Sequence, residues 1–359
     1  MARIDAFFKL MLENKASDLH LVAGSQPVLR IHGELVRVQY KVLDNQELRS
    51  LLYEITPEEK IKVFEETGDL DFAHEIPGVA RFRVNYFMHK EGIGAAFRHI
   101  PNEIKTIDQL GLPQVLKRFA MLKKGIVLVT GPTGSGKSTT LAAIIDYANT
   151  NRKERIITIE DPIEFIHPNK GCVISYREVG THTESFAKAL RAALREDPDI
   201  ILVGEMRDIE TIQLALEAAA TGHLVLSTLH TSSAIKTVDR IIDVFPPEQQ
   251  AQVRTSLSES LQAVVAQTLL RRADGRGRVA ACEILINTYA VGNLIREGKT
   301  HQILSIMQTS KSLGMQTMDD ALLQLLQEGK ITAEDAYERA TDKQKFARFL
   351  KEVPQEGIG

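Results

Sequence analysis

Cysteine is scarce in this sequence, which has only Cys172 and Cys282 among 359 residues. Two cysteines cannot build a tetracysteine zinc module, and they give no disulfide framework. The sequence therefore predicts no structural zinc. Because disulfide-poor chains are typical of reducing compartments, we expect a cytoplasmic protein.

Long apolar runs and a dominant charge are also missing. No stretch approaches the roughly 18 apolar residues of a membrane helix. The N-terminal segment is interrupted by Arg3, Asp5 and Lys9, so it does not fit a signal peptide. A net charge of −3 gives no general attraction to phosphate backbones, and we predict no nucleic-acid partner. The length suits two domains.

The first 100 residues predict a small α+β domain. Apolar residues at helical spacing predict a helix over 4–14, and alternating segments predict strands over 28–32, 34–38 and 81–87. Residues 101–113 contain two prolines and a glycine, so we interpret them as a linker.

Residues 114–290 predict an α/β core. Apolar runs at 126–129, 156–159, 200–203 and 224–229 are typical of strands buried on both faces of a parallel sheet. A capping box at 181–184 would begin the helix that follows it. From 291 to 359 the pattern is helical, with Thr317 and Thr332 as expected N-caps.

The strongest motif is Gly-Pro-Thr-Gly-Ser-Gly-Lys-Ser at 131–138, which satisfies the phosphate-loop pattern between a predicted strand and a predicted helix. Glycines let backbone N–H groups surround a phosphate chain. Lys137 would reach the β- and γ-phosphates, and the Ser138 hydroxyl would bind Mg²⁺. The predicted nucleotide-binding residues here are Gly131, Pro132, Thr133, Gly134, Ser135, Gly136, Lys137, Ser138 and Thr139. The motif predicts that ATP or GTP is bound.

Two acidic sites follow predicted strands. Gly204-Glu205 ends the run 200–203, with glycine where many phosphate-loop enzymes have aspartate. Glu205 is then the carboxylate available to Mg²⁺, partly through water, or to the attacking water. Glu164 closes the acidic block 160–164 and is a candidate for positioning or deprotonating water. Solvated acids without a catalytic role are the alternative at both sites, and the division of roles between the two glutamates is open.

Histidines flank the predicted strand 224–229. His223 precedes it and His230 follows it. One of them could sense the γ-phosphate while the other is buried or lies at a subunit contact. A structural role for a strand-end histidine is the alternative.

Arginines offer the cations that phosphoryl transfer needs. Arg81 and Arg83 share one strand face, and Arg98 lies downstream, so all three are candidates to approach the γ-phosphate from another domain. Solvated surface arginines are the alternative. A further arginine cluster around Gly275 and Gly277 predicts a basic hairpin turn.

Four blocks in fixed order resemble the secretion-type ATPases of type IV pili and type II secretion: GPTGSGKST, IITIEDPIEF, ILVGEMRD and TGHLVLSTLHT. Glycine before Glu205 is itself typical of that superfamily. The short N-terminal region and the missing zinc cysteines make the chain similar to its pilus-retraction branch. Residues 291–297, Val-Gly-Asn-Leu-Ile-Arg-Glu, are similar to the C-terminal signature of that branch.

The resemblance implies a PAS-like N-terminal domain, a RecA-like ATPase core and a homohexamer. It implies Mg²⁺-dependent ATP hydrolysis that powers pilus retraction and twitching, and it favours nucleotide-site roles for His223, His230 and the three arginines. The expected ring lies at the pilus base on the cytoplasmic side of the inner membrane, binds a platform protein and acts indirectly on pilin. Alternatives are a pilus assembly or type II secretion ATPase, a DNA-translocating motor and a non-hydrolysing nucleotide switch.

Overall fold

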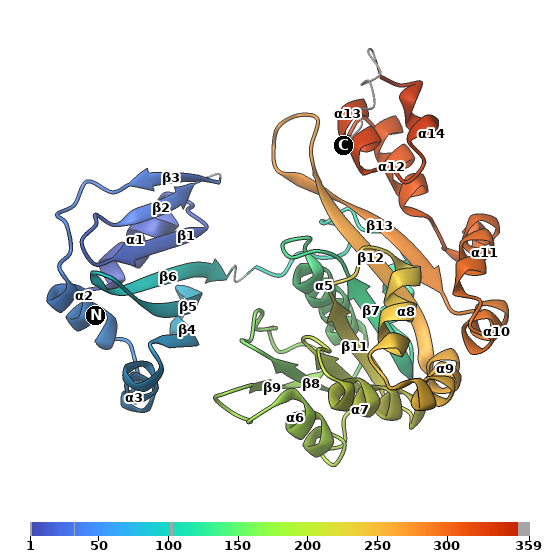
Figure 1. The fold of residues 1–359 in the computed structure, drawn as a ribbon, viewed down its shortest axis with the longest axis horizontal. Helices are drawn as coiled ribbons and strands as arrows, with labels where there is room; N and C mark the ends of the chain where they lie inside the picture. The colour runs from blue at the N-terminus through green and yellow to red at the C-terminus, as the bar shows by residue number, and fades with distance from the viewer. Residues whose placement is uncertain (1, 32, 101–102, 351–359) are drawn as a thin grey trace. The chain divides into compact units, whose positions relative to one another are not determined.

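The computed structural model describes residues 2–31, 33–100 and 103–350. The chain divides into two compact units (Figure 1). The N-terminal unit covers residues 1–103 and the segment 162–166. The second unit covers 104–161 and the chain from 167 onward, and is called the ATPase unit here after the activity that its sequence predicts. Of the predicted linker, residues 101 and 102 lie outside the described residues, as do 351–359 of the predicted helical region and His32 of a predicted strand.

The N-terminal unit is an antiparallel sheet with the strand order β3-β2-β1-β6-β5-β4, packed with helices. Its strands are β1 (Asp18–Val22), β2 (Val28–Ile31), β3 (Glu34–Arg37), β4 (Asp69–Ile76), β5 (Ala80–His89) and β6 (Gly92–Ile100). Its helices are α1 (Asp5–Glu13), α2 (Asn45–Tyr53) and α3 (Glu58–Thr67). This confirms the predicted α+β domain.

Alternation along β5 sets the core of this unit. Phe82 and Val84 are fully buried, whereas Arg81 and Arg83 point to the other face. Phe8 of α1 stacks on Phe82 with ring centroids 4.4 Å apart. The amphipathic pattern of residues 4–14 therefore packs a helix on the apolar face of the sheet.

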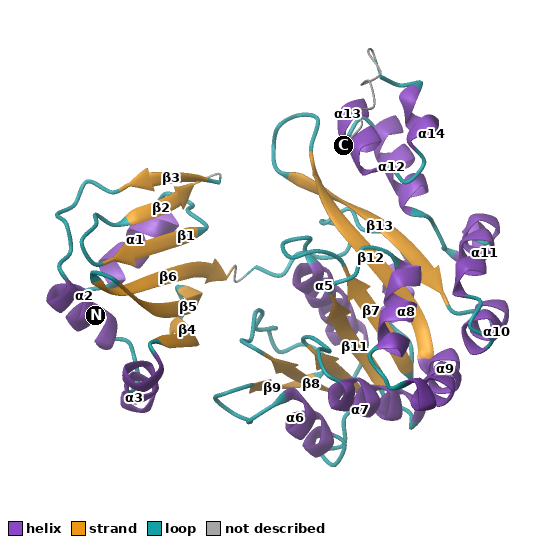
Figure 2. Cartoon of the chain, in the orientation of Figure 1, coloured by secondary structure: helices purple, strands orange, loops and turns teal. Residues whose placement is uncertain are grey.

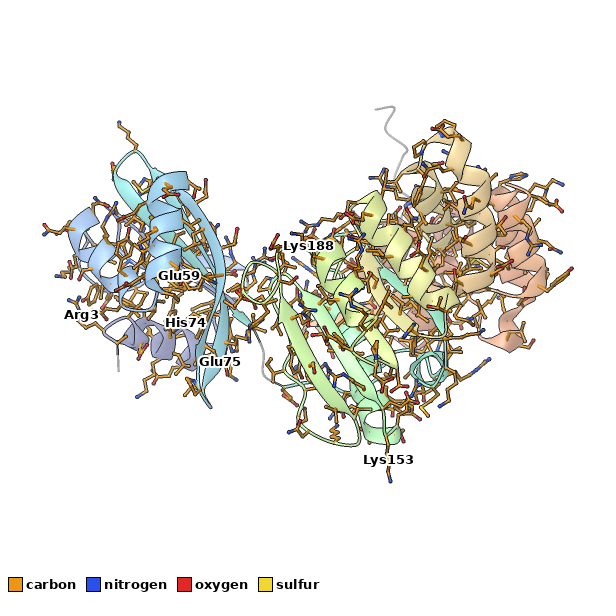
Figure 3. The ribbon with its side chains drawn as sticks, turned by 90° about the horizontal axis from the view of Figure 1, so that it is seen from below. Arg3, Glu59, His74, Glu75, Lys153 and Lys188 are labelled. Carbon is orange, nitrogen blue, oxygen red and sulfur yellow. The ribbon has the colours of Figure 1, made fainter. Side chains whose placement is uncertain are left out.

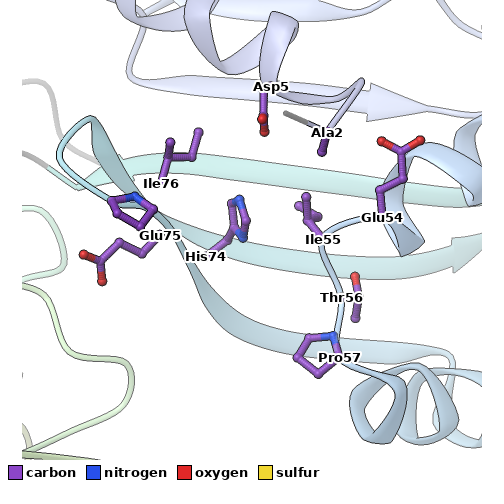
Figure 4. Close-up of a pocket in the computed structure, with 10 residues that line it drawn as sticks. Ala2, Asp5, Glu54, Ile55, Thr56, Pro57, His74, Glu75 and Ile76 are labelled. Atoms are coloured by element: carbon purple, nitrogen blue, oxygen red, sulfur yellow. The ribbon is translucent and has the colours of Figure 1, made fainter.

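The N-terminal unit also contains a hollow of about 470 Å³ between α1, β4 and the turn after α2 (Figure 4). Asp5, His74 and Glu75 line it. Glu54, also at its wall, accepts a hydrogen bond from the backbone N–H of Arg3 at 2.7 Å. None of the lining residues is among the predicted site residues.

The ATPase unit is built on a mixed, mostly parallel sheet with the order β13-β12-β7-β11-β10-β8-β9 (Figure 2). Its strands are β7 (Gly125–Thr130), β8 (Arg155–Glu160), β9 (Val173–Glu178), β10 (Ile200–Val203), β11 (Leu224–Leu229), β12 (Leu261–Arg271) and β13 (Arg278–Ile286). All neighbours pair in parallel except β12 and β13, which form an antiparallel hairpin. The predicted α/β core, its four strands and the basic hairpin turn are confirmed.

The helices of the ATPase unit surround this sheet. They are α4 (Val115–Ala120), α5 (Lys137–Asn151), α6 (Phe186–Ala193), α7 (Ile209–Ala220), α8 (Ala234–Asp243), α9 (Pro247–Ser260), α10 (Tyr289–Arg296), α11 (Ile303–Thr309), α12 (Met318–Gln327), α13 (Ala333–Arg339) and α14 (Lys343–Ala347). Short 3₁₀ turns lie at Thr300–Gln302 and Lys311–Leu313.

Helices cover both faces of the sheet, which explains the continuous apolar runs. Ile126 and Leu128 of β7 belong to one core with α6, α7 and α8, and Val127 and Val129 belong to another core with α4 and α5. Every residue of β7 is buried. A strand enclosed in this way loses the polar alternation of a one-sided strand.

The C-terminal helices pack on the hairpin. Leu270 and Val279 of the hairpin share a small core with α12, α13 and α14. The buried carboxylate of Glu283 on β13 accepts from the backbone N–H of Ala234 at 2.7 Å and of Met318 at 3.3 Å, the first residues of α8 and α12. Burial raises the pKa of Glu283 despite these two bonds. The side chain of Glu283 thus links the start of α8, in the core, to the start of α12, in the C-terminal region.

Helix starts confirm two predicted caps and correct a third. The side chains of Thr317 and Thr332 accept from the backbone N–H of the third helical residue, as predicted. The predicted capping box at Thr181–Glu184 is wrong, because α6 begins at Phe186 and Ser185 caps it. Thr181 instead donates to the carboxylate of Glu178 at 3.0 Å. A helix was predicted here, but two serine/threonine positions competed for its start.

The surface of both units is rich in charged side chains (Figure 3). Lys188 on α6, labelled in Figure 3, pairs with Glu184 four residues earlier. Within the described ranges, no helix is both long and apolar enough to cross a membrane.

Candidate active site

The phosphate loop lies between β7 and α5, as its motif predicts. Gly134 and Gly136 have φ of 78° and 86°, in the left-handed region that favours glycine. The central residues Pro132, Thr133 and Gly134 are exposed, whereas Ser135 and Lys137 are buried at the base of the loop. The loop therefore presents its backbone at the N-terminus of a fifteen-residue helix, a position that favours binding of an anion.

Side chains at the base of the loop fit a phosphate ligand. Lys137 Nζ donates to the backbone carbonyls of Gly131 at 2.9 Å and Pro132 at 3.0 Å, which keeps the ammonium at the loop. Ser135 Oγ is buried and has no hydrogen-bond partner in the part of the chain that the structure describes. Phosphate oxygens would supply acceptors to both groups. Ser138, at the second helical position, is half-buried, and its hydroxyl is a hard oxygen donor suited to Mg²⁺.

Glu205 forms the centre of a charged cluster beyond β10. Its carboxylate pairs with Arg207 Nη2 at 2.7 Å and with His230 Nε2 at 3.1 Å. Burial alone would raise the pKa of Glu205, but the hydrogen bond and charge of Arg207, with the neighbouring His230, outweigh it and lower that pKa. Glu205 is therefore ionised near neutral pH and can attract a hydrated cation. Arg207 was not predicted as a site residue, although it stands in the quoted ILVGEMRD block.

Close strand packing accounts for glycine before Glu205. A Cβ on Gly204 would lie 3.3 Å from the carbonyl oxygen of Ile159 and 3.4 Å from Cα of Glu160, on the neighbouring strand β8. The Gly204 N–H donates to Ile159 O at 2.8 Å, and its carbonyl accepts from Thr228 Oγ1 at 2.6 Å. Gly204 is thus held between β8 and β11, where a larger residue would crowd the strand ends.

The two predicted histidines lie at opposite ends of β11. His230 follows the carboxyl end and contacts Glu205, on the same edge of the sheet as the phosphate loop. His223 precedes the amino end, where its ring Nδ1 lies 3.0 Å from the carbonyl oxygen of Ala218. Within one chain, the structure joins His230 to the candidate site and places His223 at the other edge.

The acidic block is divided between the two units. Glu160 ends β8 and is buried in the ATPase unit, whereas Glu164 lies in the segment 162–166 that groups with the N-terminal unit. The ATPase unit alone therefore does not contain Glu164. The proposed role of Glu164 in positioning or deprotonating water stays a prediction.

The three predicted arginines are on the sheet of the N-terminal unit. Arg83 and Arg98 are exposed and directly opposite each other on β5 and β6. Arg98 Nε donates to the carboxylate of Asp18 at 2.8 Å, and Arg81 lies 3.6 Å from Glu75. Burial alone would raise the pKa of Asp18, but hydrogen bonds from Ser17 and Arg98 outweigh it and lower it. The approach of these arginines to a nucleotide stays a prediction.

Gln267 on β12 is a site residue that the sequence did not reveal. It is 3% exposed, and its side chain contacts both the phosphate loop and α5. A polar residue in the apolar run 261–270 was the available signal. Without the sheet order, however, nothing placed that run beside the loop.

A model of the type II/IV secretion system protein family matches residues 1–338 of this chain. The chain belongs to that family. It is 55% identical over 331 residues to the type IV pilus retraction ATPase PilT of Pseudomonas aeruginosa, covering 92% of this chain and 96% of that relative. It is 50% identical to a twitching motility protein of Neisseria gonorrhoeae, covering 91% of this chain and 87% of the relative.

A solved structure agrees with these family relationships. The crystal structure of the pilus retraction motor PilT with bound ADP matches with a TM-score of 0.89 and 47% identity, covering 97% of this chain and 99% of that one. The predicted membership of the retraction branch, the fold class and the ATPase class are confirmed. Nucleotide binding is therefore a property of this chain's family. In this chain, the residues suited to bind a nucleotide are those of the phosphate loop.

Proposed function

We propose that this chain is the ATP-hydrolysing motor of type IV pilus retraction, acting as a homohexamer. The observation that carries the proposal is its similarity, over nearly the whole length, to relatives named for pilus retraction and twitching motility. An intact phosphate loop and the Glu205–His230 pair on the same sheet edge support the chemistry. Two cysteines are too few for the zinc module that the assembly and type II alternatives would favour.

ATP and Mg²⁺ are the proposed ligands of the site. The backbone of 131–139 would surround the phosphates, Lys137 would neutralise them, and Ser138 with Glu205 would hold the metal, partly through water. When bound, Mg²⁺ would withdraw charge from the phosphate oxygens. Glu164 would direct the attacking water, His230 would orient Glu205, and Arg81, Arg83 and Arg98 would add positive charge from an N-terminal unit.

The division of work between the two glutamates has a direct test. Glu164→Gln and Glu205→Gln are compared for binding of a non-hydrolysable ATP analogue and for phosphate release. We expect both variants to bind the analogue and both to lose turnover. Retained turnover in Glu164→Gln would remove the water-directing role from that residue.

The proposed cellular position follows from the function. The hexamer would lie at the cytoplasmic face of the inner membrane, bind a platform protein of the pilus machine, and extract pilin indirectly. We expect cells lacking this chain to display surface pili that do not retract, and the wild-type chain, but not Lys137→Ala, to restore retraction. Bald cells would contradict retraction and favour an assembly ATPase. Phosphate release stimulated by DNA would favour a DNA-translocating motor instead.

A further inference from the structure

The side chain of Gln267 ties the phosphate loop to the helix that follows it. Nε2 donates to the backbone carbonyl of Ser135 at 2.6 Å, inside the loop. Oε1 accepts from the hydroxyl of Thr140 at 2.7 Å, in the first turn of α5. One amide therefore bonds to Ser135 and Thr140, which flank the predicted nucleotide-binding residues Lys137 and Ser138 in the sequence.

The two hydrogen bonds of Gln267 lie in a buried, largely apolar environment. Ala263 and Val265, on the same strand, belong to the apolar core between β12 and α5. Cys282 Sγ, from the paired position on β13, lies 3.9 Å from Gln267 Oε1. In such a dry setting hydrogen bonds are strong, and a polar group that loses its partner is costly.

The β12 backbone also shapes the loop at this point. A Cβ on Gly131 would lie 2.2 Å from the carbonyl oxygen of Gln267, and one on Gly136 would lie 2.9 Å from its Nε2. Gly131 is thus required by contact with the backbone of a strand more than a hundred positions later, and a side chain at Gly136 would displace the Gln267 amide. The conformation of the loop therefore depends on its packing against β12 as well as on its own turn.

We propose that Gln267 is a positioning residue for ATP, which holds the phosphate loop in its binding geometry before the nucleotide arrives. It acts through Ser135 and Thr140 and needs no contact with the nucleotide. Holding the loop in advance removes part of the ordering cost of binding, so it raises affinity. The proposal rests on the assignment of residues 131–138 as the phosphate loop.

The first test measures the Kd of a non-hydrolysable ATP analogue for the full-length Gln267→Leu variant by titration calorimetry. We expect the Kd to rise about tenfold, because one hydrogen bond to the loop and one to α5 are lost. Thr268→Val is the matched control, since Thr268 is the next residue and faces the other side of β12. Its Kd should stay near the wild-type value. A folded Gln267→Leu variant with wild-type affinity would overturn the proposal.

A double-mutant cycle tests the route through Thr140. Thr140→Val alone should weaken binding by a few fold, and the double variant should bind no worse than Gln267→Leu, because the two share one bond. Fully multiplicative losses would show that the residues act separately and would contradict the proposed link. Thr140→Val also provides the measurement if Gln267→Leu does not fold.

A pH profile separates positioning from general packing. Gln267→Glu keeps the shape but, when ionised, cannot donate to the Ser135 carbonyl. Because burial raises the pKa of a carboxyl, the Kd relative to wild type should be largest in alkaline solution, where the new carboxyl is ionised. It should fall at lower pH, as protonation restores a donor. A ratio that does not change with pH would assign Gln267 to packing alone.

Lys137→Ala distinguishes failure of the site from failure of the proposal. If this variant binds the analogue as tightly as wild type, residues 131–138 are not the phosphate site, and the role of Gln267 falls with them. If Lys137→Ala abolishes binding while Gln267→Leu has no effect, the phosphate loop stands and only the positioning role is wrong.

Discussion

The two edges of the ATPase sheet differ sharply, although the same strands connect them. At the carboxyl edge, Glu205, Arg207 and His230 form a charged cluster on the side of the phosphate loop. At the amino edge, backbone groups close the structure: Gly125 N–H donates to His223 O at 3.0 Å, and His223 N–H donates to Ala218 O at 3.1 Å. The carboxyl ends of parallel strands all lie at one edge of the sheet. The candidate site residues therefore lie at that edge, whereas the contacts at the amino edge are structural.

The largest expected effect is at the centre of the carboxyl edge. Glu205→Gln keeps the shape but removes the charge that pairs with Arg207 and would attract the metal. We expect phosphate release to fall about a hundredfold, the size of a lost acid–base or metal-organising group, with analogue binding retained. Steady-state phosphate release and calorimetry check this. Near-normal turnover would show that this edge does not organise the chemistry.

A smaller loss is expected when His230 is replaced. His230→Ala removes one hydrogen bond to Glu205. That bond is weakened by solvent screening, because the imidazole is half-exposed. We expect turnover to fall about fivefold. His230→Gln keeps a donor and should recover part of the rate. Equal losses in both variants would mean that hydrogen bonding to Glu205 is not what His230 contributes.

The carboxyl edge should also have its own acid dependence. Because Arg207 lowers the pKa of Glu205 below its ordinary 4.5, the ion pair's contribution to folding is complete above that value and is lost as pH falls through the lowered pKa. The free energy of unfolding of wild type minus that of Glu205→Gln should therefore be constant above pH 4.5 and shrink in more acidic solution. Urea unfolding at several pH values measures it. A difference that persists unchanged into strong acid would contradict the shift.

The smallest effect on turnover is expected at the amino edge. His223→Ala should change phosphate release by less than about twofold, while the lost ring contact with Ala218 lowers the free energy of unfolding by about 1 kcal/mol. Matched phosphate-release and urea-unfolding measurements on His223→Ala and His230→Ala test the contrast. A loss of turnover at His223 as large as that at His230 would bring the amino edge into the nucleotide cycle, for instance across a subunit boundary.

Local patterns predicted much of this fold. The buried runs of β7, β8, β10 and β11 were evident because a strand covered on both faces is apolar throughout. The long hairpin strands β12 and β13 were harder to recognise, since Gln262, Gln267 and Glu283 interrupt their apolar pattern. The start of α6 was misplaced because Thr181 and Ser185 offered the same capping chemistry within four residues, and only packing chose between them.

The positions of candidate site residues could be predicted where they stand in local motifs. They could not be predicted where the contacts join distant parts of the chain. The phosphate loop, Glu205 and His230 stand in short motifs directly after strands, so their positions could be predicted. Gln267 could not, because its partners Ser135 and Thr140 are 132 and 127 residues away in the sequence. His223 and His230 lie at opposite edges of the sheet, and this could not be predicted without knowing the direction of the strand between them.

The sequence alone was sufficient to predict a phosphate-loop ATPase of the secretion family. The residues proposed to hold phosphate, and the candidate residues that follow the strands, stand in contiguous motifs. Only the tertiary structure decided which distant side chains complete that loop and which edge of the sheet each histidine occupies. The physical reason is that backbone turns and strand burial depend on near neighbours. A buried amide such as Gln267 finds its partners only when separate strands and helices pack together.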